Sequence, residues 1–270
     1  MSLRINNNIA ALNSYRNLSF TSVQMGKSLE KLSSGFRINR AADDAAGLVK
    51  SESLRAEIKG TQGAIKNAQD GISFVQTAEG ALNEVHSILQ RMRELSVDAA
   101  NTATTDGVAQ QAEVDELLAE LDAIGSRTTF AGRQVFSADT LTFHVGAGTA
   151  DNLAVTTDLT LGAASVFGVD ISGLSLTTDA TGAIASIDAA ISAVSNVRSE
   201  LGATQNRLEH TVNNLSVALE NLTASESRIR DTDMAMEMAN FTRHQILGQA
   251  GVSMLAQANT LPQNVLSLLR

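Results

Sequence analysis

The sequence has no cysteine, no tryptophan and one proline in 270 residues, and only 3% of its residues are aromatic. The missing cysteines exclude a disulfide scaffold, a thiol nucleophile and thiolate metal ligands. Pro262 stands close to the end of the chain, so no proline interrupts a helix anywhere before it. With so few rings, the apolar 43% consists mostly of Ala, Leu, Val and Ile, which suit thin seams between helices rather than a wide globular core.

Long apolar runs are also missing. No window approaches 18 consecutive apolar residues, so we expect no membrane-spanning helix and no membrane partner. The first twenty residues lack a basic end followed by an unbroken apolar run, so we expect no signal peptide.

The net charge of −9 is unevenly distributed. Residues 1–40 carry six Lys/Arg and one acidic residue. Residues 41–230 carry 12 Lys/Arg and 25 acidic residues. A cationic arm on an acidic body argues against nucleic acid as a partner and favours packing against other protein, including further copies of the chain.

Apolar spacing predicts helices in both halves of the chain. The first helical stretch is broken by "KLSSGFRINRAADDAAGL", from Lys31 to Leu48, which combines small residues with charged ones. Asp43 and Asp44 suit the start of a second helix, where carboxylates cap free amides, and this helix should continue to about Asn101. A shorter amphipathic helix is expected over 108–125.

The middle of the chain has strand patterning. Leu141, Phe143 and Val145 alternate with polar residues, and a second strand begins at Leu153, so we expect a β-hairpin near 135–175.

In the second half, apolar residues recur at every seventh position, a spacing typical of a coiled coil. A long helix in an ordinary bundle is the alternative. The positions are Val194, Leu201, Leu208, Leu215, Leu222, Ile229 and Met236. We therefore predict a mainly α fold: a long antiparallel coiled-coil or helical-bundle rod with paired N- and C-termini and a small β-hairpin region in mid-chain.

The ends of such a rod have little core of their own. Segments 1–40 and 235–270 still carry wide apolar faces, so we expect other copies of the chain, or a chaperone, to bury them. The alternative is that they fold back as a helical cap.

No constellation for catalysis is present. Four histidines lie in different segments without ligand spacing, and the G-x-G of "VGAGT" leads from a strand into a turn rather than into a helix. We therefore expect no enzyme activity, no cofactor and no metal site.

Four stretches, two near each end of the chain, carry a family resemblance. "LSSGFRINRAADDAAGL" and "QGAIKNAQDGISFVQTAEGALNEV" closely resemble the N-terminal signature of bacterial flagellin, and "SRIRDTDMAMEMANFTRHQIL" with "QAGVSMLAQANTLPQNVLSLLR" resembles its C-terminal one. The resemblance implies an extracellular structural subunit that is exported unfolded and polymerises into the filament used for swimming. A hook–filament junction protein or another flagellar axial protein is the alternative.

The resemblance also implies domains. Residues 1–40 with 235–270 would form the inner-tube helices, and 41–234 the outer-tube helices with the hairpin. Large outer domains should be absent, because only about 50 residues separate the helical halves.

In this family the signature stretch is the spoke that joins the two tubes. We expect small residues to let the backbone pass through a crowded space, and the charged residues to pair within the chain or between subunits. Ordinary capping and surface charge are the alternative. The residues are Ser33, Ser34, Gly35, Arg37, Arg40, Asp43 and Asp44.

Further partners are implied by the same resemblance. "QRMRELSVD" is similar to the family motif that a vertebrate innate immune receptor recognises, with Asp98 where the motif has Gln; subunit packing is the alternative role. The matching receptor-contact residues are Gln90, Arg91, Leu95 and Glu113. A flagellar export chaperone, the filament cap and hook-junction proteins are also expected partners. The candidate chaperone or inner-tube contacts are Leu255, Leu261, Val265, Leu266 and Leu269.

Overall fold

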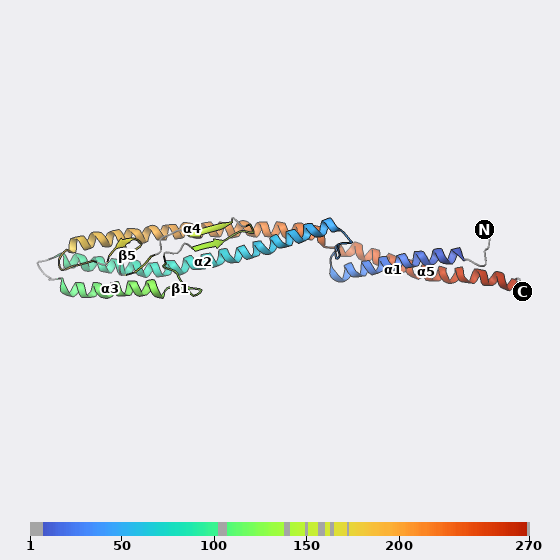
Figure 1. Cartoon of the computed structure of the whole chain (residues 1–270), viewed down its shortest axis with the longest axis horizontal. Helices are drawn as coiled ribbons and strands as arrows, with labels where there is room; N and C mark the ends of the chain where they lie inside the picture. Colours follow the sequence, from blue (N-terminus) through green and yellow to red (C-terminus); the bar gives the residue numbers. More distant parts are fainter. Residues whose placement is uncertain are drawn as a thin grey trace. The chain divides into compact units, whose positions relative to one another are not determined.

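The computed structural model describes residues 8–101, 107–137, 141–148, 151–155, 160–162, 165–171 and 173–268, and its description of side chains leaves out Val155 and 261–268. Helices dominate this part of the chain (Figure 1). They are α1 (Ile9–Ser34), α2 (Ala45–Ala99), α3 (Val108–Arg127), α4 (Ala180–Arg230) and α5 (Met234–Leu268). The prediction of a mainly α fold with long helices is confirmed.

The chain forms two compact units, and each joins an N-terminal part to a C-terminal part. Unit 1 contains Met1–Ala56 and Asn221–Arg270, and unit 2 contains Glu57–Glu220. The boundaries fall inside α2 and α4, whereas the sequence placed them at the helix breaks near residues 40 and 235.

Unit 2 has a continuous apolar core between α2, α3 and α4. Leu82 and Leu89 of α2 stand seven residues apart and are fully buried, as are Leu121 of α3 and Ile187 of α4. Spacings of three, four and seven residues place these side chains on one face of each helix, which explains why three helices share one core.

The strands form three antiparallel pairs in the described part of unit 2. The longest pair joins β3 (Leu141–His144) to β4 (Asn152–Val155), and confirms the predicted hairpin. The Asn67 side-chain amide of α2 donates to the His144 carbonyl at 2.9 Å, and the Phe74 and Phe143 rings lie 5.9 Å apart, so the hairpin is attached to α2. The shorter pairs are β1 (Thr129–Phe130) with β2 (Arg133–Gln134) and β5 (Ser165–Val166) with β6 (Val169–Asp170).

The seven-residue seam follows α4 for most of its predicted length. Its first three positions, Val194, Leu201 and Leu208, are buried, and Leu215, Leu222 and Ile229 are half-buried. The prediction was wrong at Met236, which belongs to α5 and is 65% exposed. The chain leaves helical conformation between Arg230 and Met234, so the repeat continues in the sequence across a break between two helices.

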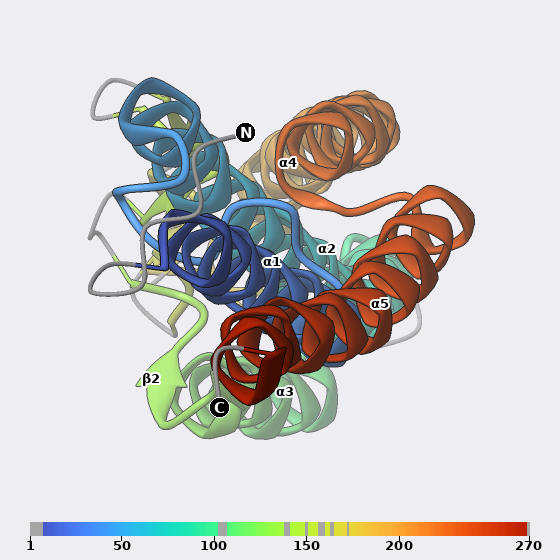
Figure 2. The same ribbon diagram turned by 90° about the vertical axis from the view of Figure 1, so that its right-hand side faces the viewer.

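Unit 1 contains α1 and α5 packed side by side, together with the first turns of α2 and the last turns of α4 (Figure 2). The side chain of Asn8 caps α1 by accepting the Ala11 amide at 3.1 Å, and donates to the Ala258 carbonyl of α5 at 2.8 Å. Among its described side chains, only Ile38 and Ala258 are buried apolar residues. Unit 1 therefore has almost no core of its own.

One described helix, α4, is long and apolar enough to cross a membrane by length and composition alone. Its apolar residues Val194 and Leu201 lie in the core of unit 2, and Asp188 forms an ion pair with Arg93 at 2.6 Å. The helix therefore buries its apolar side in protein.

Candidate functional site

The break between α1 and α2 begins at Gly35. This residue has φ +76°, in the left-handed region that favours glycine, and its amide donates to the Lys31 carbonyl at 2.8 Å. A Cβ atom added at Gly35 would meet no atom within 4 Å. Within the described part of the subunit, backbone conformation therefore explains this glycine, and the expected crowding does not.

The two serines lie in the last turn of α1 and are exposed. The hydroxyl oxygen of Ser34 accepts hydrogen bonds from the Phe36 amide at 3.1 Å and from the Asn39 side-chain amide at 2.9 Å. Ser34 thus stabilises the turn at the end of α1. The side chain of Ser33 is exposed to solvent.

Both aspartates accept backbone amides. Asp44 caps α2, since its Oδ1 accepts the Gly47 amide at 2.9 Å. Asp43 Oδ2 accepts the amides of Arg40 at 3.0 Å and Asn39 at 3.2 Å. The Arg40 amide is the main reason why the pKa of Asp43 lies below its usual value, with the Asn39 amide, Lys27 and Lys31 acting in the same direction.

The two arginines bind elsewhere. Arg40 Nε pairs with Glu30 Oε1 at 2.9 Å, and the Arg37 guanidinium donates to the carbonyl of Ile229. Arg37 and Arg40 form no ion pair with Asp43 or Asp44 within the described residues, so the predicted pairing inside one chain was wrong. The carboxylates instead satisfy free amides at the turn and at the start of α2.

The second break, between α4 and α5, lies against the first. The Arg37 amide donates to the Arg230 carbonyl at 2.6 Å, and the Thr232 amide donates to the Gly35 carbonyl at 2.9 Å. These bonds form an antiparallel bridge between Phe36 and Asp231. The two breaks are therefore joined by main-chain hydrogen bonds, and we call this region of unit 1, residues 35–44 with 230–233, the joint.

The side chain of Arg230 stabilises the joint through two contacts. Its guanidinium lies 4.8 Å from the centroid of the Phe36 ring, and its Nη1 donates to Glu52 Oε1 at 2.7 Å. The Arg230 side chain is only 14% exposed, and its Nε is buried without a partner among the described residues. The hydrogen bond from Arg230 is the main reason why the pKa of Glu52 is lowered, followed by the bond from Arg55.

Sequence reasoning missed Arg230, Phe36, Glu52 and the buried Ile38. Two signals were available. Arg230 directly precedes Asp231, and Asp233 follows two residues later; both aspartates are typical capping residues. Ile38 is the only large apolar residue between Phe36 and Leu48.

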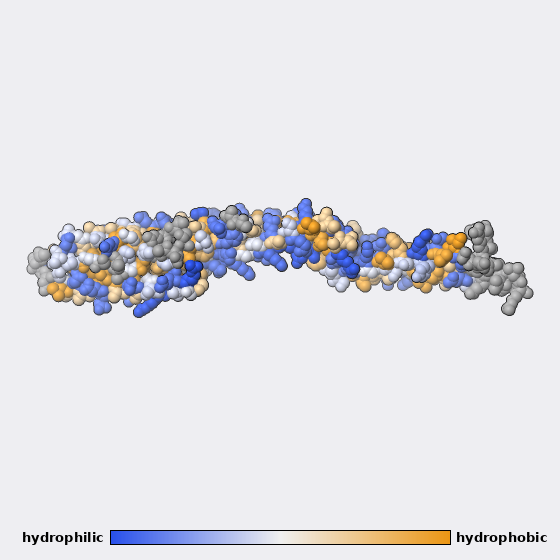
Figure 3. All heavy atoms as spheres, viewed as in Figure 1, coloured by the Kyte–Doolittle hydropathy of each residue, from blue (hydrophilic) through white to orange (hydrophobic). Residues whose placement is uncertain are grey.

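The terminal helices expose many large apolar side chains, which Figure 3 shows as orange patches between hydrophilic ones. All but three of the exposed large apolar side chains that the structure describes belong to unit 1. Those of α1 and α5 are Ile9, Leu12, Tyr15, Phe20, Val23, Leu29, Met234, Met236, Met238, Ile246, Leu247, Val252 and Met254.

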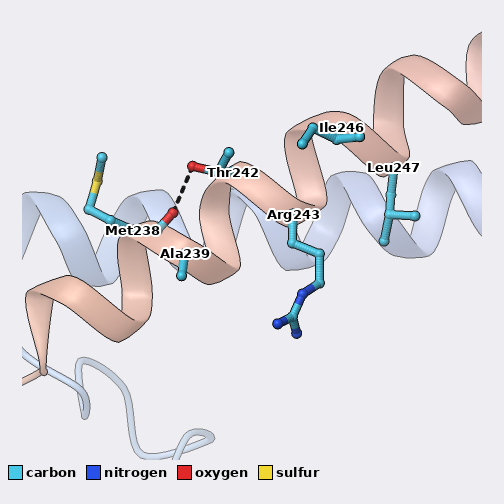
Figure 4. Close-up of a pocket in the computed structure, with 6 residues that line it drawn as sticks. All are labelled: Met238, Ala239, Thr242, Arg243, Ile246 and Leu247. Atoms are coloured by element: carbon cyan, nitrogen blue, oxygen red, sulfur yellow. Dashed lines mark hydrogen bonds between the residues drawn. The ribbon is translucent and has the colours of Figure 1, made fainter.

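Two open grooves follow these faces. One lies along α5 alone and is lined by side chains from Met238 to Leu247, with Arg243 among them (Figure 4). The other lies between α1 and α5, with Leu18 and Met25 on one side and His244 and Val252 on the other.

Among the predicted C-terminal contact residues, the structure describes the side chain of Leu255. Leu255 is half-buried on α5. Leu261, Val265 and Leu266 lie in the helical backbone of α5 but outside the described side chains, and Leu269 lies outside the described residues.

The candidate receptor residues lie in unit 2. Arg91 is exposed, and its guanidinium pairs with Glu113 at 2.8 Å and with Glu94 at 3.2 Å; the bond to Glu113 is the main reason why the pKa of Arg91 is raised. Gln90 is also exposed, and its side chain lies 2.9 Å from His86 Nε2. Leu95 was misassigned as a surface contact, because it is 4% exposed and belongs to the core.

No group of three or more potential metal-ligating side chains occurs among the described residues. The arrangement of unit 1 offers hydrogen-bonded breaks and open apolar faces, which suit binding between proteins rather than chemistry on a small molecule.

Comparisons with known proteins give the family context. Residues 5–140 match the bacterial flagellin N-terminal helical region, and residues 184–269 match the bacterial flagellin C-terminal helical region. A flagellin of Halalkalibacterium halodurans is 50% identical over 272 residues, covering 98% of this chain and 99% of the relative. A flagellin of Bacillus subtilis is 47% identical over 304 residues, covering 99% of this chain and 100% of the relative. Among solved structures, Bacillus cereus flagellin gives a TM-score of 0.48 at 25% identity, covering 56% of this chain and 88% of that one.

Proposed function

This chain belongs to the bacterial flagellin family and is a structural subunit of the extracellular flagellar filament, and we propose that its unit 1 is the part that neighbouring subunits bury on assembly. Swimming motility would follow from the filament, and export of the unfolded chain would precede assembly. In the domain scheme that we propose, residues 1–40 and 235–270 form the inner tube and 41–234 form the outer tube.

One observation supports this proposal above the others, namely the contrast between the two units. Unit 2 buries a continuous core, whereas the described side chains of unit 1 include two buried apolar residues and many exposed ones. Fully burying one large apolar side chain stabilises by about 1.5–3 kcal/mol. Association with further copies would therefore supply the apolar burial that a single subunit lacks.

The joint has a second part in the proposal. Its main-chain bonds and the contacts of Arg230 hold α1 and α5 to the first turns of α2 and the last turns of α4. We propose that this region acts as the spoke. Arg37, Arg40, Asp43 and Asp44 would then add contacts between subunits, where Arg40 and Ser33 are exposed enough to reach a neighbour.

The remaining partners are proposals at the level of class. The apolar C-terminal segment suits an export chaperone that covers it before assembly. Its proposed contacts are Leu255, Leu261, Val265, Leu266 and Leu269. The filament cap and the hook-junction proteins would meet the same terminal helices. A vertebrate innate receptor would meet Gln90, Arg91 and Glu113 on the surface of unit 2.

Assembly of purified full-length protein tests the central proposal. Phe20→Ser and Ile246→Ser each place a hydroxyl on an exposed apolar face of unit 1, so we expect the critical concentration for filament growth to rise about tenfold, with an unchanged melting temperature of the monomer. Val108→Ser is the matched control, because Val108 is equally exposed but lies in unit 2. Electron microscopy and sedimentation measure the filaments. Normal filaments from both unit 1 variants would overturn the proposal.

A further inference from the structure

The methionines are concentrated on one helix. Four of the six described methionines, Met234, Met236, Met238 and Met254, belong to α5 and are 48–65% exposed. The other two differ, because Met25 of α1 is half-buried and Met92 of α2 is fully buried. Four of the seven exposed large apolar side chains described on α5 are thus thioethers, although leucine would provide a similar volume.

The four side chains lie away from the face of α5 that packs on α1. Glu237 marks the packed face, since it is buried and its carboxylate lies 4.0 Å from Lys31 Nζ of α1. Met236 and Met238 flank this residue and point about 100° to either side of it at 3.6 residues per turn. Met234 lies one turn from Met238, and Met254 lies about five turns from Met236, so the methionines form two stripes along the helix.

The stripes continue into the open groove of α5. Met238 lines one end of that groove, and Ile246 and Leu247 line the other end, about two turns further along α5 (Figure 4). The thioethers are therefore part of the apolar surface that a neighbouring subunit would cover, and they are open to solvent in the single subunit.

A thioether differs from leucine in one chemical respect. Its sulfur lone pair attacks an oxygen of hydrogen peroxide, a sulfur–oxygen bond forms, the oxygen–oxygen bond breaks, and water leaves after proton transfer. Sulfur is oxidised by two electrons and the peroxide is reduced by two. The product, methionine sulfoxide, is polar and is reduced again by methionine sulfoxide reductases.

We propose that Met234, Met236, Met238 and Met254 form an oxidation site that stops the free subunit from assembling when peroxide is present. The inference rests on the proposed function, because it requires that neighbours bury this face of α5. In the free subunit a sulfoxide remains hydrated and leaves the fold intact. In an interface the same oxygen loses its water, and this opposes association unless a donor replaces that water.

The test uses full-length protein treated with hydrogen peroxide as a monomer, followed by mass spectrometry of each methionine and sedimentation of filaments. We expect the four α5 methionines to oxidise at least about tenfold faster than Met92, because reaction follows exposure. We expect the critical concentration of the oxidised subunit to rise about tenfold, and reductase treatment to restore it.

A variant with leucine at all four positions is the matched control, and Met92→Leu is the control for a core methionine. The fourfold variant should assemble equally well before and after peroxide, whereas Met92→Leu should lose assembly on oxidation as the parent does. If the fourfold variant does not assemble at all, restoration of the oxidised parent by the reductase still decides the question.

Normal assembly of parent protein that is oxidised at all four positions would overturn the inference, and so would a loss of assembly that the reductase leaves unchanged. Failure of untreated parent protein to form filaments would instead count against the proposed function.

Discussion

The side-chain amide of Asn8 donates to the carbonyl of Ala258 at 2.8 Å, and Ala258 stands four residues before Pro262. In an α-helix that carbonyl would accept the amide of residue 262, but proline has no N–H. Asn8 therefore supplies the hydrogen bond that Pro262 cannot make. The same side chain also caps α1, so one residue compensates for proline in α5 and starts α1.

Substitution of Asn8 separates these two roles. Asn8→Ala removes both bonds and should destabilise the start of α1 by about 1–2 kcal/mol. Asn8→Asp keeps the cap acceptor and loses the donor, so its cost should be smaller. Amide exchange of Ala11 and of the last turns of α5 measures both effects.

The background Pro262→Ala is the control for Asn8. An alanine amide at 262 would donate to Ala258, and Asn8→Asp should then cost nothing further. A cost for Asn8→Asp that is the same in both backgrounds would show that the bond to Ala258 is not compensating for the proline.

Arg230 should be the most sensitive side chain of the joint. Arg230→Ala removes its contact with the Phe36 ring and its bond to Glu52, and should destabilise unit 1 by about 2 kcal/mol. Exchange of the Thr232 and Arg37 amides, which bond across the joint, reports the opening directly. Arg228→Ala is the matched control on the same helix, because Arg228 is exposed and its guanidinium donates to the hydroxyl of Ser225, one turn earlier, at 3.2 Å. Equal exchange in the two variants would contradict the role of Arg230.

The joint should loosen in acid. The pKa values of Glu52 and Asp43 are both lower in the folded chain than in an unfolded one, where carboxyl groups titrate near pH 4. A lowered pKa contributes stability that is complete above the unfolded value and is lost as the pH falls through the folded value. The protection factor of the Thr232 amide, which is its intrinsic exchange rate divided by its observed rate, should therefore fall below about pH 4.

Glu52→Gln tests the carboxylate in that response. The Thr232 protection factor of the variant should be lower than that of the parent at pH 7 and should depend less on pH between about 5 and 3. If its pH profile parallels that of the parent throughout, the bond from Arg230 to Glu52 does not cause the acid response.

The sequence predicted the long helices and the hairpin because their signals are periodic and extend over many residues. The seven-residue repeat identified the seam of α4 through Ile229 but also included Met236, because a repeat shows no break when the next helix starts in phase. The joint was harder to predict. Its aspartates bond to backbone amides, and Arg37 bonds to a carbonyl, and such partners have no signature in residue identity.

Residues far apart in the sequence were the second difficulty. The contact between Arg230 and Phe36 depends on how two helix breaks meet, and neither break indicates the other in the sequence. Leu95 was difficult for a different reason. It lies within the motif that resembles a receptor-binding surface, so it was predicted to be a surface contact, but its side chain is buried in the core.

The proposed binding of an innate receptor requires that the receptor contact the side of α2 that carries Arg91. Arg91 and Arg93 are exposed to similar extents on this helix, and each forms an ion pair, with Glu113 at 2.8 Å and with Asp188 at 2.6 Å. Two residues apart on a helix, they point in nearly opposite directions. They therefore form a matched pair for a test on monomeric protein.

Arg91→Ala should lower receptor signalling about tenfold or more if Arg91 is a binding hot spot, whereas Arg93→Ala should leave signalling unchanged. Arg91→Ala loses its exposed ion pairs with Glu113 and Glu94, and Arg93→Ala loses the pair with Asp188. Exposed ion pairs contribute little to stability, so the melting temperatures of the two variants should agree. A reporter cell assay measures the dose of monomer that gives half of the maximal signal. Equal doses for Arg91→Ala and the parent would leave Arg91 with a role in packing only, because its bonds to Glu113 and Glu94 would then account for its position on the helix.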